Sequence, residues 1–211
     1  MSWRGESYRH SMSAHGLRTA RGAVLPREKT INVNGFVNVD YSIAGTLQTL
    51  NSFGFHTIQS CSGVKADHPN NGCEHTNGYI AFFKKDLSSQ QIHKLGKAAQ
   101  AANLALIIDP DNVGIGSGHG LGLFFTPGVY VRTSITKDGT TRKNIIRQAN
   151  KLADKEFGKR DETGTNWLGW MDYRDNKEKE LIKQHGGWRF TTDTQVRNAW
   201  SKFEQELTKN V

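Results

Sequence analysis

Long apolar runs are missing from this sequence of 211 residues. No segment approaches the roughly 20 consecutive apolar residues that a helix needs to cross a bilayer. The first ten residues, MSWRGESYRH, also lack the apolar stretch found in secretory signals. We therefore expect a protein of the cytoplasm that has no membrane partner.

Cysteine is scarce as well. The two cysteines, Cys61 and Cys73, are too few for a disulfide framework, and without export we expect both to stay reduced. The sequence shows no internal repeat. Its acidic residues form no recognisable pair of catalytic carboxylates, so hydrolysis by two acids is not expected.

Positive charge is in excess, with a formal net charge of +8, and it is concentrated in two segments. Residues 1–30 contain six Lys or Arg against two Glu, and residues 131–160 contain nine against three acids, which leaves −2 for the remainder. Clustered cations are typical of proteins that bind polyanions, because neutralising phosphates releases counterions. We expect nucleic acid or another phosphate-bearing ligand as the partner; a basic surface that only aids solubility is the alternative.

The pattern of the chain predicts three segments: a basic leader over 1–30, a core domain over 31–158 and an aromatic-rich helical extension over 159–211 that packs on the core. Within the core, apolar spacing predicts helices at 40–53, 88–102 and 141–157 and strands at 55–60, 78–83, 104–108, 121–126 and 129–136. This order indicates an α+β fold, a mixed sheet with helices packed mainly on one face.

Two further helical faces follow from the same spacing. The helix after residue 192 places an apolar stripe against the sheet, made of Val196, Trp200, Phe203 and Leu207. The helix at 141–157 is expected to turn Ile146, Ala149, Ala153 and Phe157 inward. Its cations lie largely elsewhere, and we expect them to contact nucleic acid: Arg142, Lys143, Arg147 and Lys151.

The segment QSCSGVKADHPNNGCEH contains four residues of the types that bind zinc, namely Cys61, His68, Cys73 and His75. Their spacing argues against a zinc site, because there is no Cys-x-x-Cys pair and six residues separate Cys61 from His68. The alternative to a zinc site is nucleophilic catalysis, with Cys61, exposed where a strand ends, as the candidate catalytic nucleophile. Such a thiol requires a lowered pKa from a nearby cation or helix N-terminus.

The run GIGSGHGLG over 114–122 has Gly-x-Gly spacing, but it leads into a predicted strand and not into a helix that could bind pyrophosphate. A lid or backbone nest that binds an anion, or a plain hairpin connection, remains. In the first case Gly116, Ser117 and Gly118 bind ligand and His119 is a second candidate catalytic residue.

Ser60-Cys61-Ser62-Gly63, at a strand end after a helix, resembles the wybutosine-synthesis methyltransferase family, and the order of elements over about 40–158 is similar too. The resemblance implies an α+β core whose ligand pocket is lined by Ser60, Ser62 and Gly63, with S-adenosylmethionine as cofactor and tRNA as substrate. RNA is therefore expected ahead of DNA. The family usually has arginine after the glycine, where this chain has Val64.

The leader resembles segments of uncharacterised archaeal and archaeal-virus proteins, which implies no activity. Two functional hypotheses follow. One is an S-adenosylmethionine-dependent, tRNA-modifying enzyme, and the other is a nucleic-acid-binding or small-ligand-binding protein without catalysis.

Overall fold

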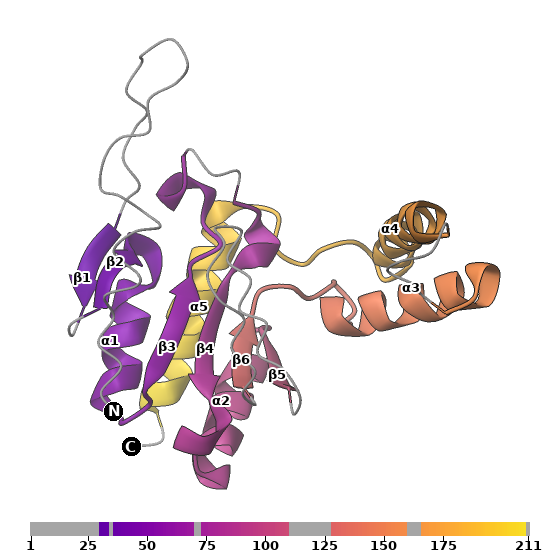
Figure 1. Ribbon diagram of the computed structural model, residues 1–211. Coiled ribbons are helices and arrows are strands. Elements are labelled where there is room, and N and C mark those ends of the chain that lie inside the picture. The colour runs from indigo at the N-terminus through magenta and orange to yellow at the C-terminus, as the bar shows by residue number, and fades with distance from the viewer. Residues whose placement is uncertain (1–29, 34–35, 70–72, 110–127, 160–165, 210–211) are drawn as a thin grey trace.

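The structure is a computed structural model, and it describes residues 30–33, 36–69, 73–109, 128–159 and 166–209 (Figure 1). The helices and strands follow one another in this order: β1 (Thr30–Val33), β2 (Phe36–Asp40), α1 (Ala44–Ser52), β3 (Thr57–Cys61), β4 (Tyr79–Phe83), α2 (Ser89–Ala101), β5 (Ala105–Asp109), β6 (Gly128–Arg132), α3 (Arg142–Phe157), α4 (Trp167–Gln184) and α5 (Asp193–Thr208).

Four strands form one sheet in the order β3-β4-β6-β5, with every neighbouring pair antiparallel. Helices α1, α2 and α5 cover one face of this sheet (Figure 1). The predicted α+β architecture with helices on one face is confirmed. The predicted mixed sheet is wrong, because every strand pair in this sheet is antiparallel. The small hairpin of β1 and β2 was not predicted by the sequence pattern.

Capping residues set where two of these helices begin. Ser88 and Gln91 form a reciprocal capping box at α2, and Thr192 and Gln195 form another at α5. Each box satisfies backbone N–H groups that a helix start otherwise leaves without partners. Both helix starts are therefore readable from the sequence, as predicted.

Helix α5 packs in the centre of the core. The side chains of Val196, Trp200, Phe203 and Leu207 are fully buried, as the apolar stripe predicts. Burying each such side chain contributes roughly 1.5–3 kcal/mol to folding as an upper estimate. Trp200 also donates its Nε1–H to the backbone carbonyl of Ser62 over 2.8 Å, which ties α5 to the loop after β3.

Helices α3 and α4 pack on each other and project away from the sheet as a pair, which we call the helical arm (Figure 1). The face of α3 toward α4 is made by Ile145, Ala149 and Ala153, all fully buried. In α4, Trp170 donates Nε1–H to Asp154 of α3 over 3.0 Å.

The predicted inward face of α3 is therefore partly wrong. Ala149 and Ala153 are buried, but Ile145 takes the place predicted for Ile146, which is only half-buried. Phe157 is 38% exposed and packs edge-on against Tyr173 of α4. The physical reason is that α3 packs on a second helix and not on the broad face of the sheet.

Strand β6 ends earlier than the pattern predicts, at Arg132 instead of Thr136. Thr133 still donates its N–H to the carbonyl of Gly78, but Ile135 and Thr136 form isolated bridges with Thr141 and Trp188 instead of continuing along β4. β-branched composition alone therefore misleads. The predicted strand at 121–126 and residues 1–29 of the predicted leader lie outside the described residues. No helix in the described ranges has the length and apolar character needed to cross a membrane.

Two glycines with nearly equal φ allow a matched test of packing in the loop after β3. Gly63 has φ of 71°, and an added Cβ would lie 2.7 Å from the backbone N of Gly78. Gly54 has φ of 75° with no atom near an added Cβ. We expect Gly54→Ala to cost about 1–2 kcal/mol from backbone conformation alone, and Gly63→Ala to cost about 1–3 kcal/mol more from overpacking. Urea unfolding of both variants measures the difference, and equal losses would contradict it.

Candidate functional site

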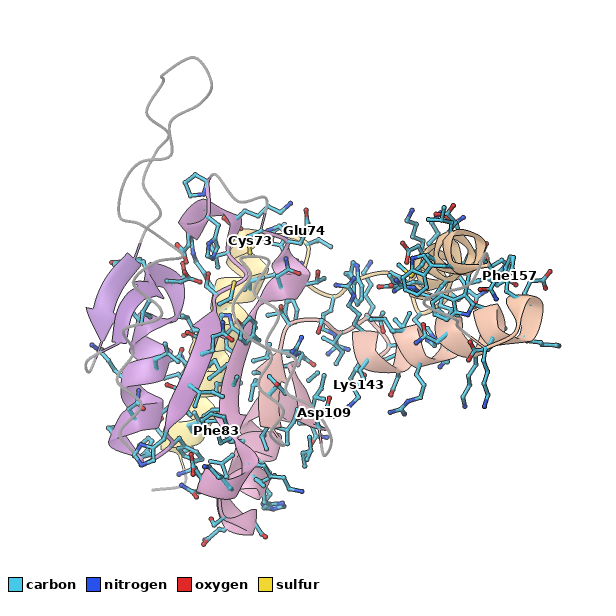
Figure 2. All side chains as sticks on the ribbon, in the orientation of Figure 1. Cys73, Glu74, Phe83, Asp109, Lys143 and Phe157 are labelled. Carbon is cyan, nitrogen blue, oxygen red and sulfur yellow. The ribbon has the colours of Figure 1, made fainter. Side chains whose placement is uncertain are left out.

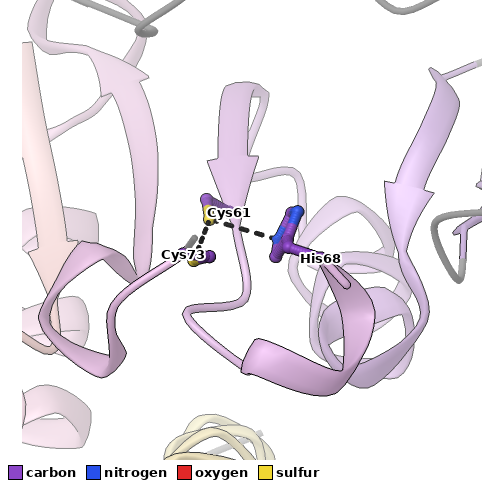
Figure 3. A group of neighbouring side chains, drawn as sticks. All are labelled: Cys61, His68 and Cys73. Atoms are coloured by element: carbon purple, nitrogen blue, oxygen red, sulfur yellow. Dashed lines mark hydrogen bonds between the residues drawn. The ribbon is translucent and has the colours of Figure 1, made fainter. Parts of the chain in front are cut away.

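Three side chains of metal-binding or nucleophilic type converge at the end of β3 (Figure 3). The sulfur of Cys61 lies 3.9 Å from the sulfur of Cys73 and 3.6 Å from Nε2 of His68. The three ligand atoms all lie within 4.8 Å of one another. Both thiols are free, Cys73 is buried and the other two residues are half-buried. We call these residues the Cys-His-Cys cluster.

The loop that follows β3 folds back on itself and so brings the cluster together. A short 3-10 helix, η3 (Lys65–Asp67), reverses the chain before His68. Asp67 accepts hydrogen bonds from both the backbone N–H and the hydroxyl of Ser42. A second short helix, η4 (His75–Asn77), follows Cys73 and leads into β4.

Asp193, the first residue of α5, secures the same loop. Its two carboxylate oxygens accept the backbone N–H groups of Lys65 and Ala66 at 2.8 and 3.1 Å, and one lies 2.9 Å from Nε2 of His75. His75, the fourth predicted ligand type, is therefore bound to Asp193 and lies outside the cluster. Burial acts to raise the pKa of Asp193, but these three hydrogen bonds outweigh it and lower that pKa.

Asp40, at the end of β2, adjoins the cluster from the opposite side. Its Oδ2 accepts the backbone N–H of Ser62 at 2.6 Å and lies 2.9 Å from Nε2 of His68. Asp40 and Cys61 thus share one nitrogen of the His68 ring. A catalytic Cys-His-Asp relay requires the thiol and the carboxylate on different ring nitrogens, so the present geometry is not that of a relay.

The protonation of the two thiols is coupled. The hydrogen bond with Cys73, followed by burial, raises the pKa of Cys61, and the same hydrogen bond lowers the pKa of Cys73. A raised pKa is the opposite of what an activated nucleophile requires. Burial alone would lower the pKa of His68, but contacts with Asp40 and Cys61 raise it to about 11.

The predicted ligand-binding residues beside Cys61 occupy two different settings. Ser60 is half-buried in β3 opposite Ile80. Ser62 is fully buried: its N–H donates to Asp40, its hydroxyl accepts from the N–H of Val64, and its carbonyl accepts from Trp200. The polar atoms of Ser62 are thus engaged within the protein. Gly63 packs directly against the backbone of Gly78.

Gly116, Ser117, Gly118 and His119 lie outside the described residues. The structure therefore gives no position for the second candidate catalytic residue relative to Cys61.

A residue that the sequence pattern did not single out, Arg132, lies on the face of the sheet opposite the helices. The register pairs Cys61 with Tyr79 and Tyr79 with Arg132, so the three share one row and one face. The Arg132 guanidinium lies 5.6 Å from the ring centre of Tyr79 and 4.7 Å from that of Tyr130. Two strand spacings put it about 10 Å from Cys61 along the row.

Arg132 is half-buried, and among the described residues no carboxylate forms an ion pair with it. Burial is the main reason that its pKa is lowered. Nearby Arg142 lowers it further, whereas Tyr130, Tyr79 and the charge of Asp109 act to raise it. The period-two pattern of Tyr79 with Ala81, and of Tyr130 with Arg132, is the sequence signal that could have identified this face.

The four predicted nucleic-acid-binding cations on α3 differ in their partners. Arg142 pairs with Glu178 at 2.9 Å, and Lys143 pairs with Asp109 at 3.0 Å (Figure 2). Arg147 and Lys151 are exposed. Because Lys143, Arg147 and Lys151 recur every four residues, and Lys155 continues the series, they lie along one stripe of the helix.

Asp193 allows a test of how firmly the loop is held. We expect Asp193→Ala to lower the free energy of unfolding at pH 7 by about 1.5–3 kcal/mol, because charge-assisted hydrogen bonds are lost. The pKa of Asp193 is lowered in the folded protein, so its contribution is present above the ordinary aspartate pKa of about 3.9 and is lost as pH falls below it.

Urea unfolding between about pH 7 and pH 3 measures this effect. Asp175→Ala, which removes a half-exposed carboxylate on α4, is the matched control and should change stability by less than about 0.5 kcal/mol. A loss for Asp193→Ala that is independent of pH would contradict the assignment.

Comparison with known proteins adds no relative: no family model, no curated protein and no solved structure matches this chain.

Proposed function

We propose that this protein binds a phosphate-bearing ligand, RNA ahead of DNA, through Arg132 on the sheet and the basic stripe of α3. The observation that carries the proposal is the half-buried Arg132 guanidinium. It lies 5.6 and 4.7 Å from the centres of two tyrosine rings and forms no ion pair with a carboxylate among the described residues.

A guanidinium that is partly removed from water is costly to leave without an anionic partner. Its planar fork matches the oxygens of a phosphate, and the rings of Tyr79 and Tyr130 lie beside it. Tyr79 is half-buried, and aromatic rings beside arginine on a sheet are a common means of binding unpaired bases. The second face of the sheet thus combines a hydrogen-bond donor for phosphate with an aromatic ring that a base can contact.

The basic stripe on α3 extends this charge beyond the sheet. Helix α3 contains five Lys or Arg against two acids, a net charge of +3. From Lys143 to Lys155 the stripe covers about 18 Å at the helical rise of 1.5 Å per residue. Its first turn lies next to the sheet, because Lys143 pairs with Asp109 at the end of β5 and Arg142 is near enough to lower the pKa of Arg132. These cations form one continuous surface.

The preference for RNA rests on the resemblance of Ser60–Gly63 to the wybutosine-synthesis methyltransferases. The resemblance also supports S-adenosylmethionine as a ligand. The row of Cys61, Tyr79 and Arg132 begins within that segment, so a bound RNA on the second face would lie beside it.

Two double variants separate the basic stripe from net charge. We expect Arg147→Gln/Lys151→Gln to weaken binding of a labelled single-stranded RNA and to lower the slope of log affinity against log salt by about 1.4, since each phosphate contact on a single strand contributes about 0.7. Lys84→Gln/Lys97→Gln removes the same charge from exposed sites near β4 and on α2 and should leave the slope nearly unchanged.

Fluorescence anisotropy between about 50 and 200 mM salt provides the measurement, with DNA of the same sequence as a second ligand. Arg132→Gln should reduce affinity for RNA more than Arg147→Gln or Lys151→Gln does as a single substitution. Salt-insensitive binding, or an equal loss in the two double variants, would refute the proposed surface.

The cofactor is tested separately by calorimetry of the full chain with S-adenosylmethionine. Binding at millimolar concentration or tighter is expected if the protein modifies RNA. If the chain binds RNA but S-adenosylmethionine produces no heat of binding, the hypothesis of a nucleic-acid-binding protein without catalysis is supported.

A further inference from the structure

We propose that Cys61, His68 and Cys73 bind a divalent cation of the zinc type. This site is independent of the proposed RNA binding, and it is inferred from the arrangement of the three donor atoms at the end of β3 (Figure 3).

Two of the three distances between the donor atoms match those that a tetrahedral zinc ion imposes. With Zn–S of about 2.3 Å and Zn–N of about 2.0 Å, tetrahedral angles place two sulfurs about 3.8 Å apart and a sulfur and a nitrogen about 3.5 Å apart. The structure has 3.9 Å between the sulfurs of Cys61 and Cys73, and 3.6 Å between the Cys61 sulfur and Nε2 of His68. The third pair, the Cys73 sulfur and Nε2 of His68, lies within 4.8 Å. One ion can contact all three atoms once the loop brings that pair to about 3.5 Å.

The kinds of donor agree with these distances. Two thiolates and one imidazole are ligands that zinc prefers, and three protein ligands leave a fourth position. A disulfide is the competing use of two neighbouring cysteines, but it requires an oxidant and sulfurs about 2.05 Å apart. At 3.9 Å the two sulfurs are instead at the separation that a shared ion requires.

Asp40 adjoins the three donor atoms without belonging to the group that lies within 4.8 Å of one another, so it would have to move toward the ion to serve the fourth position. Its Oδ2 lies 2.9 Å from the same Nε2 of His68 that faces Cys61. An ion bound at that nitrogen would replace the contact between His68 and Asp40. The carboxylate is then left facing the ion, while its hydrogen bond from the N–H of Ser62 keeps it oriented.

The spacing in the sequence argues against zinc because it reflects only how far apart the ligands are along the chain. In the structure, η3 turns the chain back between Cys61 and His68, and Cys73 returns ahead of η4, so ligands separated by six and four residues meet. A bound ion would tie the ends of β2 and β3 to this loop. It would therefore hold the loop beside the row that contains Arg132.

The site is tested on the full chain, reduced and then loaded with zinc or with cobalt as a spectroscopic probe. We expect about one equivalent of metal per chain by elemental analysis, and a cobalt spectrum with thiolate charge-transfer bands. Zinc should also raise the melting temperature of the metal-free protein, because only the folded chain presents the site.

Single substitutions identify the ligands. Cys61→Ser, Cys73→Ser and His68→Asn should each weaken zinc binding at least about 100-fold in competition with a chromophoric chelator, and Asp40→Asn should weaken it about 10–100-fold. His56→Asn is the control: it removes an exposed histidine that precedes β3 and lies outside the loop, and zinc affinity should be unchanged.

Far-ultraviolet circular dichroism of each metal-free variant shows whether it has folded. If a variant does not fold, the cobalt spectrum of the wild-type chain decides, since two thiolate ligands give stronger charge transfer than one or none. Less than about a tenth of an equivalent of bound metal in the reduced wild-type chain would overturn the proposal. A purified chain whose two thiols react only after reduction, and which takes up no metal once reduced, would overturn it in favour of a disulfide.

Discussion

The backbone of Ser62 is held from two sides, and the parts of the core meet there. The Asp40 carboxylate at the end of β2 accepts its N–H, and Trp200 of α5 donates to its carbonyl. Both partners are buried, so losing either bond would leave a polar group without compensation in the interior. The loop after β3 is thereby fixed to the hairpin and to the last helix of the core, and the positions of Cys61 and His68 depend on it.

This constraint divides the Ser-Cys-Ser-Gly segment between structure and chemistry. Ser62 and Gly63 are used within the protein, the first by hydrogen bonds and the second by close contact with Gly78. Cys61 is left at the end of its strand, where its sulfur meets Cys73 and His68 while its row on the sheet continues to Arg132. A metal site and an anion-binding site would then lie about two strand spacings apart, roughly 10 Å.

The helical arm adds the cations of α3 to the surface formed by the proposed metal site and the proposed anion-binding site. Helices α3 and α4 pack on each other through small and aromatic residues, so the cationic side of α3 is left toward solvent. Lys143 and Arg142 form ion pairs at the base of the arm, whereas Arg147 and Lys151 are exposed. Charge near the sheet thus forms ion pairs at the base of the arm, and the exposed charge farther along is what the proposed polyanion would contact.

Local chemistry explains what the sequence alone could determine. Capping boxes at Ser88 and Thr192, the apolar stripe of α5 and the α+β order of elements are set by residues within a few positions of one another. Packing against α4 determines which side of α3 is buried. Cys61, His68 and Cys73 meet because hydrogen bonds to Asp67 and Asp193 hold the loop in its reversed path. Arg132 became a candidate only once antiparallel pairing placed it over Tyr79. These features arise from contacts between distant segments, and only the tertiary structure determines such contacts.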